Sequence, residues 1–123
     1  MARRTVLLVE DSEEVRDALV ELLQLGGHAV EAVGDGIEGV ERARASRPEV
    51  ILVDMGLPGI DGLEVGRRIR AHLGDVPLLV AVTGQGRDED RRRALDAGFD
   101  ELLAKPVDVA RLERVVEDGK RAR

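Results

Sequence analysis

The chain has 123 residues, which is the length of one ordinary domain with a single hydrophobic core. Its 25 acidic residues outnumber the 19 lysines and arginines, and the net charge of −6 argues against direct binding to nucleic acid. There is no cysteine and Phe99 is the single aromatic residue, so disulfides, thiolate metal sites and aromatic stacking platforms are excluded.

Strand-like and helix-like patterns alternate along the chain. Strands are predicted where aliphatic residues run together, and helices where they recur every three or four positions. In chain order, the predicted elements are a strand at 5–9, a helix at 12–25, a strand at 28–33, a helix at 36–46, a strand at 50–53, a helix at 62–73, a strand at 76–82, a helix at 87–97, a strand at 99–104 and a helix at 107–119. This alternation predicts an α/β, doubly wound, five-stranded parallel sheet with five helices.

The composition of the strands predicts their order in the sheet. Residues 5–9, 50–53 and 76–82 are almost entirely apolar, which is typical of strands buried on both faces. Residues 28–33 and 99–104 carry more polar side chains, and we expect them at the two edges. The order 2-1-3-4-5 follows, a flavodoxin-like arrangement in which ligands bind beyond the carboxyl ends of the strands.

Polar residues gather where the predicted strands end. They are Glu10, Asp11, Asp54, Thr83, Gly84 and Lys105. Each has an ordinary explanation when taken alone, as a helix-opening acid, a turn residue or a solvated lysine, but their joint placement on one rim favours a site. Clustered carboxylates repel one another unless a cation neutralises them, and oxygen ligands with room for water suit Mg²⁺.

Four segments resemble a known family. They are "VLLVEDSEEVRDAL", "VILVDMGLPGIDGLEV", "VAVTGQG" and "ALDAGFDELLAKPVD". In their order and spacing, over nearly the whole chain, they resemble the receiver domain of two-component response regulators. The last two are also similar to the receivers of hybrid sensor histidine kinases. On this resemblance residues 1–123 form a single receiver domain with no effector or kinase domain, which acts alone or is part of a larger protein.

The resemblance implies roles for the rim residues. Asp54 would accept a phosphoryl group from a phosphohistidine of a sensor histidine kinase or a phosphotransfer protein, forming an aspartyl phosphate. Mg²⁺ would be bound by Asp11, Asp54 and the backbone carbonyl of Gly56, with Glu10 acting through water. The metal would offset the repulsion between the acceptor and the incoming phosphoryl group.

The resemblance also implies a switch. Lys105, aimed by a cis peptide bond to Pro106, would pair with the phosphoryl oxygens. Thr83, next to Gly84, would turn inward to hydrogen-bond one of them. This movement would repack the face formed by the fourth helix, the fifth strand and the fifth helix, where a downstream protein would dock. Phosphorylation-linked dimerisation stays open.

Two positions depart from the family pattern. Leu102 stands three residues before Lys105, where the family usually has an aromatic switch residue, and the only ring nearby, Phe99, is expected in the core. Gly56 lacks the side chain that helps many relatives to place a hydrolytic water. Gln85 is the remaining candidate for that role, and we expect modest self-dephosphorylation.

Three alternative functions compete with this interpretation. "GDGIEG", at 34–39, fits a dinucleotide-binding pattern, but it follows a polar strand and the chain is too short for both halves of that fold. A phosphatase with an aspartyl-phosphate intermediate would need a substrate pocket and a second acid two residues after Asp54. A receiver-like binding module that never turns over phosphate stays open, because Leu102 weakens the switch but leaves the site complete.

The remaining polar and charged residues are expected on the surface of the protein. His28 and His72 are expected on the surface away from the rim, Arg91–Arg93 on a solvated helix face, and "GKRAR" in a frayed tail. No segment resembles a signal peptide or a membrane span. Together with the lack of cysteine, this predicts a cytoplasmic protein that binds neither membranes nor nucleic acid.

Overall fold

The structure is a computed structural model that describes residues 3–84 and 86–119. Its elements are β1 (Thr5–Val9), α1 (Glu13–Leu25), β2 (Ala29–Val33), α2 (Gly36–Ser46), β3 (Val50–Asp54), α3 (Gly62–Leu73), β4 (Leu78–Thr83), α4 (Asp88–Asp96), β5 (Glu101–Ala104) and α5 (Val109–Asp118). The strands form one parallel sheet in the order β2-β1-β3-β4-β5. The predicted fold class, strand order and edge strands are confirmed.

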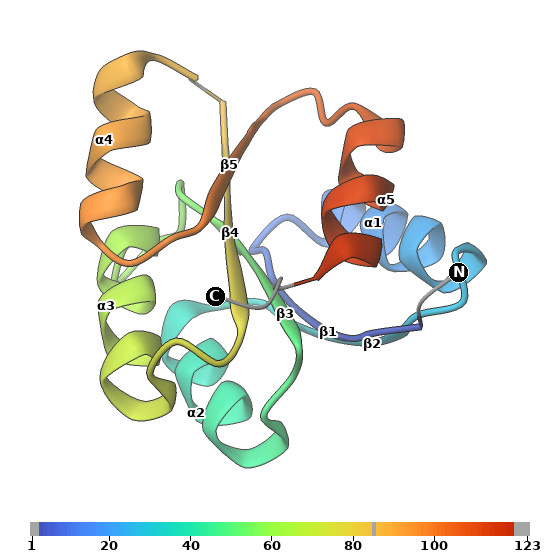
Figure 1. Ribbon diagram of the computed structural model, residues 1–123, viewed down its shortest axis with the longest axis horizontal. Helices are drawn as coiled ribbons and strands as arrows, with labels where there is room; N and C mark the ends of the chain where they lie inside the picture. Colours follow the sequence, from blue (N-terminus) through green and yellow to red (C-terminus); the bar gives the residue numbers. More distant parts are fainter. Residues whose placement is uncertain (1–2, 85, 120–123) are drawn as a thin grey trace.

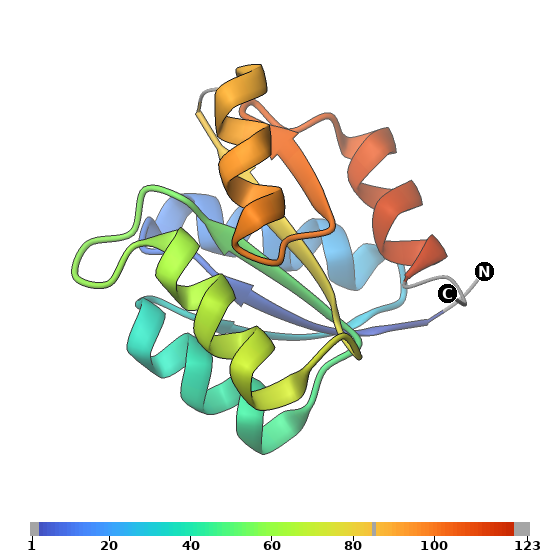
Figure 2. The same ribbon diagram turned by 60° about the vertical axis from the view of Figure 1, so that its left-hand side comes forward.

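Helices cover both faces of this sheet, with α1 and α5 on one side and α2, α3 and α4 on the other (Figures 1 and 2). Successive strand residues point to opposite faces, so each strand supplies both layers of the core. In β1, Val6 and Leu8 pack with α1 and α5, whereas Leu7 and Val9 pack with α2 and α3. All five residues of β3 are buried, as its apolar sequence predicts.

The helix starts follow side-chain caps. The Ser12 hydroxyl accepts a hydrogen bond from the Val15 N–H, and α1 therefore begins at Glu13. The Asp35 carboxylate caps α2 in the same way. A Cβ on Gly36 would lie 2.7 Å from side-chain atoms of Ile60, so this glycine of "GDGIEG" allows close packing. Its place at the start of α2 confirms that the motif shapes the turn into the helix.

Some boundaries differ from the predicted ones. β4 begins at Leu78 rather than at residue 76, because Val76 is 78% exposed and Pro77 has no N–H to donate to a neighbouring strand. β5 begins at Glu101 rather than at residue 99. Phe99 precedes it in the turn and is buried, which confirms that the ring belongs to the core.

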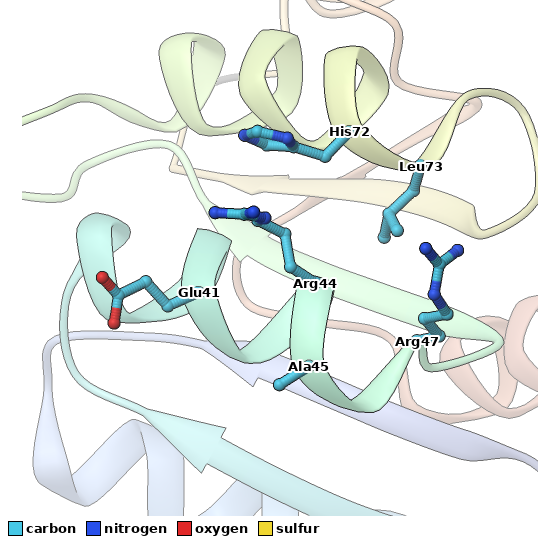
Figure 3. Close-up of a pocket in the computed structure, with 6 residues that line it drawn as sticks. All are labelled: Glu41, Arg44, Ala45, Arg47, His72 and Leu73. Carbon is cyan, nitrogen blue, oxygen red and sulfur yellow. The ribbon is translucent and has the colours of Figure 1, made fainter.

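The surface predictions hold for most of the residues that the structure describes. His72 is exposed on the last turn of α3, facing α2 (Figure 3), and Arg91–Arg93 are exposed on α4. Residues 120–123 of the predicted tail lie outside the described residues. No helix within 3–84 and 86–119 is both long and apolar enough to pass through a bilayer.

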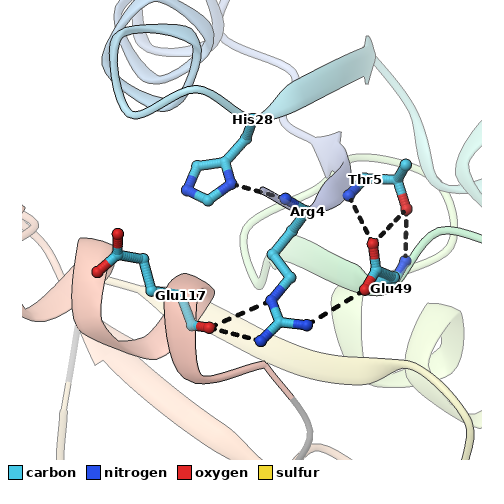
Figure 4. Close-up of polar contacts among 5 residues, drawn as sticks. All are labelled: Arg4, Thr5, His28, Glu49 and Glu117. Atoms are coloured by element: carbon cyan, nitrogen blue, oxygen red, sulfur yellow. Dashed lines mark hydrogen bonds and ion pairs between the residues drawn. The ribbon is translucent and has the colours of Figure 1, made fainter. Parts of the chain in front are cut away.

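The prediction for His28 is wrong, because its side chain is buried and takes part in a group of polar contacts at the amino ends of β1, β2 and β3 (Figure 4). The His28 Nδ1 accepts a hydrogen bond from the Arg4 N–H at 3.0 Å. The Arg4 guanidinium in turn donates to the Glu117 carbonyl at 2.6 Å and pairs with Glu49 at 3.3 Å. The imidazole thus supplies an acceptor for a partly buried backbone N–H just before β1.

Replacing His28 with leucine is expected to lower the free energy of unfolding by about 1–3 kcal/mol, because the Arg4 N–H loses its acceptor. His28→Asn is the matched control, since its amide oxygen can take the position of Nδ1. Urea unfolding at neutral pH measures both variants. Equal losses for Leu and Asn would contradict a role for the hydrogen bond.

Candidate functional site

Three acidic side chains meet at the carboxyl ends of β1 and β3. Glu10 follows β1 and is 1% exposed, Asp54 ends β3 and is 6% exposed, and Asp11 is exposed on the rim. One carboxylate oxygen of each lies within 4.8 Å of the others. The structure therefore brings together the three carboxylates that were predicted to share the rim at the carboxyl ends of the strands.

Lys105 supplies the positive charge of the cluster. Its Nζ lies 3.2 Å from Asp54 Oδ1 and 3.4 Å from Glu10 Oε1. The Lys105 N–H donates to the Thr83 carbonyl at 2.7 Å, and the peptide bond to Pro106 is cis, as the resemblance implied. Because β5 lies two strands away from β3, the side chain reaches the carboxylates across the end of β4.

Backbone groups hold the buried carboxylates in place. The Ser12 N–H donates to Glu10 Oε2 at 3.1 Å, and the Gly56 N–H donates to Asp54 Oδ1 at 3.1 Å. The Arg16 guanidinium donates to the Glu10 carbonyl at 3.0 Å. Sequence reasoning missed Arg16, whose signal is a lone cation among the acids of "EEVRDALVE". The Ser12 and Gly56 N–H groups compensate for the desolvation of the two carboxylates, and Arg16 fixes the backbone beside Glu10.

Burial and mutual repulsion change the proton affinity of the cluster. Burial raises the pKa of the Glu10 carboxyl, and the nearby charge of Asp54 raises it further against the opposing hydrogen bond from Ser12. Desolvation alone would lower the pKa of Lys105, but the hydrogen bond and charge of Asp54, with those of Glu10, outweigh it and raise that pKa. Lys105 therefore stays charged at neutral pH.

The donor chemistry of the cluster fits Mg²⁺. Three carboxylates face one ammonium group, which leaves an excess of negative charge that a divalent cation would balance. The clustered ligands are all oxygen atoms, and exposure of Asp11 and Gly56 leaves room for water molecules. Asp11, Asp54 and the Gly56 carbonyl would hold the ion directly, with Glu10 behind them.

The predicted switch residues lie beside the cluster on β4 and β5. Thr83 ends β4, and its side chain is partly exposed. Thr83 and Leu102 line a hollow of about 180 Å³ between α3 and α4, together with Met55 and Asp61. Leu102 is 3% exposed, so the aliphatic side chain already points into the core.

The loop after β4 is described only in part. Gly84 is exposed and directly follows Thr83. Gln85 lies outside the described residues, so its expected role in placing water stays a prediction.

Replacing Lys105 with methionine is expected to strengthen Mg²⁺ binding about tenfold, which equals about 1.4 kcal/mol. The ammonium sits against two of the carboxylates that would hold the ion, and removing it ends the competition between the two cations. Isothermal titration with Mg²⁺ measures the change, with Arg44→Met on α2 as a control for altered net charge. Unchanged or weaker binding in Lys105→Met would contradict the predicted competition.

Comparison with known sequences agrees with the resemblance carried by the sequence motifs. Residues 6–117 match the family of the response regulator receiver domain. The response regulator MprA of Mycobacterium leprae (strain TN) is 39% identical over 101 residues, which cover 82% of this chain and 44% of that protein. The chain thus spans less than half the length of the curated relatives it matches.

Solved structures agree with this match. The receiver domain of sensor histidine kinase PA1611 from Pseudomonas aeruginosa PAO1 is 36% identical, with a TM-score of 0.86 over 96% of this chain and 98% of that one. That structure has a magnesium ion coordinated in its active site cleft. The chemotaxis protein CheY4 of Vibrio cholerae is 26% identical, with a TM-score of 0.89 over 97% of this chain and 100% of that one.

Proposed function

This chain belongs to the family of response regulator receiver domains, and from that premise we propose that Asp54 accepts a phosphoryl group from a phosphohistidine. The donor would be a sensor histidine kinase or a phosphotransfer protein of a two-component phosphorelay in the cytoplasm. The observation that carries the proposal is the buried Asp54 carboxylate, 3.2 Å from the Lys105 ammonium and within 4.8 Å of two further acids.

The contacts of Asp54 suggest different roles for its two carboxylate oxygens. Oδ1 accepts hydrogen bonds from the Gly56 N–H and Lys105 Nζ, which fix the orientation of the carboxylate. Oδ2 is then the oxygen that attacks phosphorus, while the bond from phosphorus to the histidine nitrogen breaks and that nitrogen keeps the electron pair. Lys105 would turn from the carboxylates to the new phosphoryl oxygens.

Mg²⁺, when bound by Asp11, Asp54 and the Gly56 carbonyl with Glu10 through water, would supply neutralisation of the phosphoryl charge. The protein's own share is to hold the acceptor still. The hydrogen bonds of Ser12 and Gly56 fix two carboxylates before the donor arrives, so little reorganisation is needed.

Phosphorylation would be passed on as a structural change that begins at Thr83. Its side chain would turn toward the phosphoryl group, and the face formed by α4, β5 and α5 would repack as a result. A downstream protein, or a second copy of the chain, would dock on this face. With Leu102 buried in the resting protein, the change would pass through the packing of α4 rather than through a rotating ring. Residues 1–123 would act as one receiver domain, with Gln85 assisting slow self-dephosphorylation.

Intact-mass measurement after incubation with a small phosphodonor tests the proposal. We expect a gain of one phosphoryl group with Mg²⁺ and no gain when a chelator removes it. Labelling that survives alkali and hydroxylamine, or that does not need Mg²⁺, would contradict an aspartyl phosphate, because both reagents cleave an acyl phosphate. Lack of labelling with every donor, together with measurable Mg²⁺ binding, would favour the second candidate, a receiver-like binding module that works without phosphorylation. The buried Leu102 is the observation that keeps this candidate open.

A further inference from the structure

A second hollow, of about 500 Å³, lies between the last turns of α2 and α3 (Figure 3). These turns lead into β3 and β4, so the hollow is at the amino ends of the strands, and Asp54 is at the opposite edge of the sheet. Its lining residues are Glu41, Arg44, Ala45, Arg47, His72 and Leu73. The phosphoacceptor chemistry uses none of them.

Three cationic or protonatable side chains of this lining, Arg44, Arg47 and His72, have no ion pair and no side-chain hydrogen bond with any described residue. Neighbouring arginines on the same two helices are paired. Arg42 binds Glu31 at 2.6 Å, and Arg68 binds Glu64 at 3.0 Å. Exposed arginines elsewhere, such as Arg91 on α4, also have no ion pair with a described residue, so the distinguishing feature of Arg44 and Arg47 is that they share one hollow.

Figure 3 shows how these groups are arranged. The Arg44 guanidinium lies beneath the His72 imidazole, and the Arg47 guanidinium faces Leu73. Glu41 is the one acid in the lining, and its carboxylate points away from both arginines. The positive groups therefore face the open space between the helices.

The backbone of Arg47 is unusual. It caps the end of α2 in the left-handed conformation, with φ at +46°, where glycine is the favoured residue. For a residue with a side chain this conformation costs about 1–2 kcal/mol. The partial negative charge of helix ends favours cations near them, but it does not require an arginine at this strained position. What an arginine adds at this position is a guanidinium that lines the hollow.

We propose that the hollow binds a small ligand with a diphosphate group, of the size and class of a nucleoside diphosphate. Two guanidinium groups can each bind phosphate oxygens in pairs, and two such groups around one space suit two adjacent phosphates. Ala45, Leu73 and the face of the His72 ring give an apolar surface for an organic part. The volume lies in the range of small-molecule sites, about 300–1,000 Å³.

The two histidines of the chain provide the test, since His72 lies in the hollow and His28 is buried elsewhere. Imidazole proton resonances are followed by NMR while pyrophosphate or ADP is added in buffer free of divalent cations. We expect a saturable shift of His72 with no shift of His28. Tighter binding of ADP than of pyrophosphate would identify a nucleotide, and equal binding a free diphosphate. No shift, or the same shift with sodium chloride at equal ionic strength, would overturn the proposal.

Variants separate binding from folding. Arg47→Gly removes the guanidinium but relieves the backbone, so it should weaken pyrophosphate binding at least tenfold without lowering the melting temperature. Arg91→Gln, an exposed arginine on α4, is the matched control and should bind as the wild type does. Unchanged binding by Arg47→Gly would refute the site. The same titration with Asp54→Asn keeps the result independent of phosphorylation.

Discussion

Replacing Asp54 with asparagine should reduce phosphoryl acceptance to background while the fold is kept. The amide oxygen of asparagine can still accept the hydrogen bond from the Gly56 N–H, so the end of β3 keeps its local structure. A neutral amide, however, is a poor nucleophile and a weak ligand for a divalent cation. We therefore expect no phosphorylated species by intact mass, and at least tenfold weaker Mg²⁺ binding.

Asp75→Asn is the control for this variant. Asp75 is an exposed acid in the loop between α3 and β4, so its replacement makes the same change of charge far from the cluster. It should be phosphorylated at the wild-type rate. Wild-type phosphorylation of Asp54→Asn would place the acceptor on another residue and would overturn the assignment.

The residues of the rim were predictable because their positions follow from the strand order of the sheet. Once a parallel sheet and the order 2-1-3-4-5 were inferred, Glu10, Asp54 and Lys105 had to share an edge, whatever their side chains contact. The Ser12 cap was predictable because its signal, a serine followed by two glutamates, is local in sequence. The family resemblance added the cis isomer of the Lys105–Pro106 peptide bond, which no local sequence pattern indicates.

Long-range contacts between side chains and backbone were not predictable. His28 was expected on the surface, because no local pattern shows that its acceptor nitrogen meets the Arg4 N–H, 24 positions earlier. Arg70 and Asp100 gave no signal either, because an arginine on a helix is ordinary and its carboxylate partner is 30 residues away. Such pairs depend on the conformation of the loops that lead into the strands. Hydrophobic periodicity carries no information about loop conformation.

The Arg70 side chain joins two loops near the amino end of β4, the one before this strand and the one before β5. Its guanidinium donates to the carbonyls of Gly98 at 2.7 Å, Pro77 at 2.9 Å and Gly74 at 3.0 Å. It also binds the Asp100 carboxylate at 2.8 Å, and both side chains of this pair are less than 15% exposed. Asp100 in turn accepts the Leu79 N–H, which ties the pair to β4.

Replacing Arg70 with methionine is expected to lower the free energy of unfolding by about 3–5 kcal/mol, the largest loss we predict for a single side chain. The change leaves a mostly buried carboxylate without its cation and removes the donor of three carbonyl groups. Urea unfolding followed by circular dichroism measures the loss. Arg68→Met is the matched control on the same helix, because its pair with Glu64 is exposed and should contribute less than about 1 kcal/mol.

A double variant separates the cost of an unpaired charge from the value of the pair. In Arg70→Met with Asp100→Asn no buried carboxylate is left and the amide oxygen can still accept the Leu79 N–H, so we expect part of the lost stability to return. The carbonyls of Gly98 and Pro77 still lack their donor, and recovery should therefore be incomplete. A double variant no more stable than Arg70→Met would show that the loss comes from the loop carbonyls, so that Arg70 acts mainly as a hydrogen-bond donor to the turns around β4.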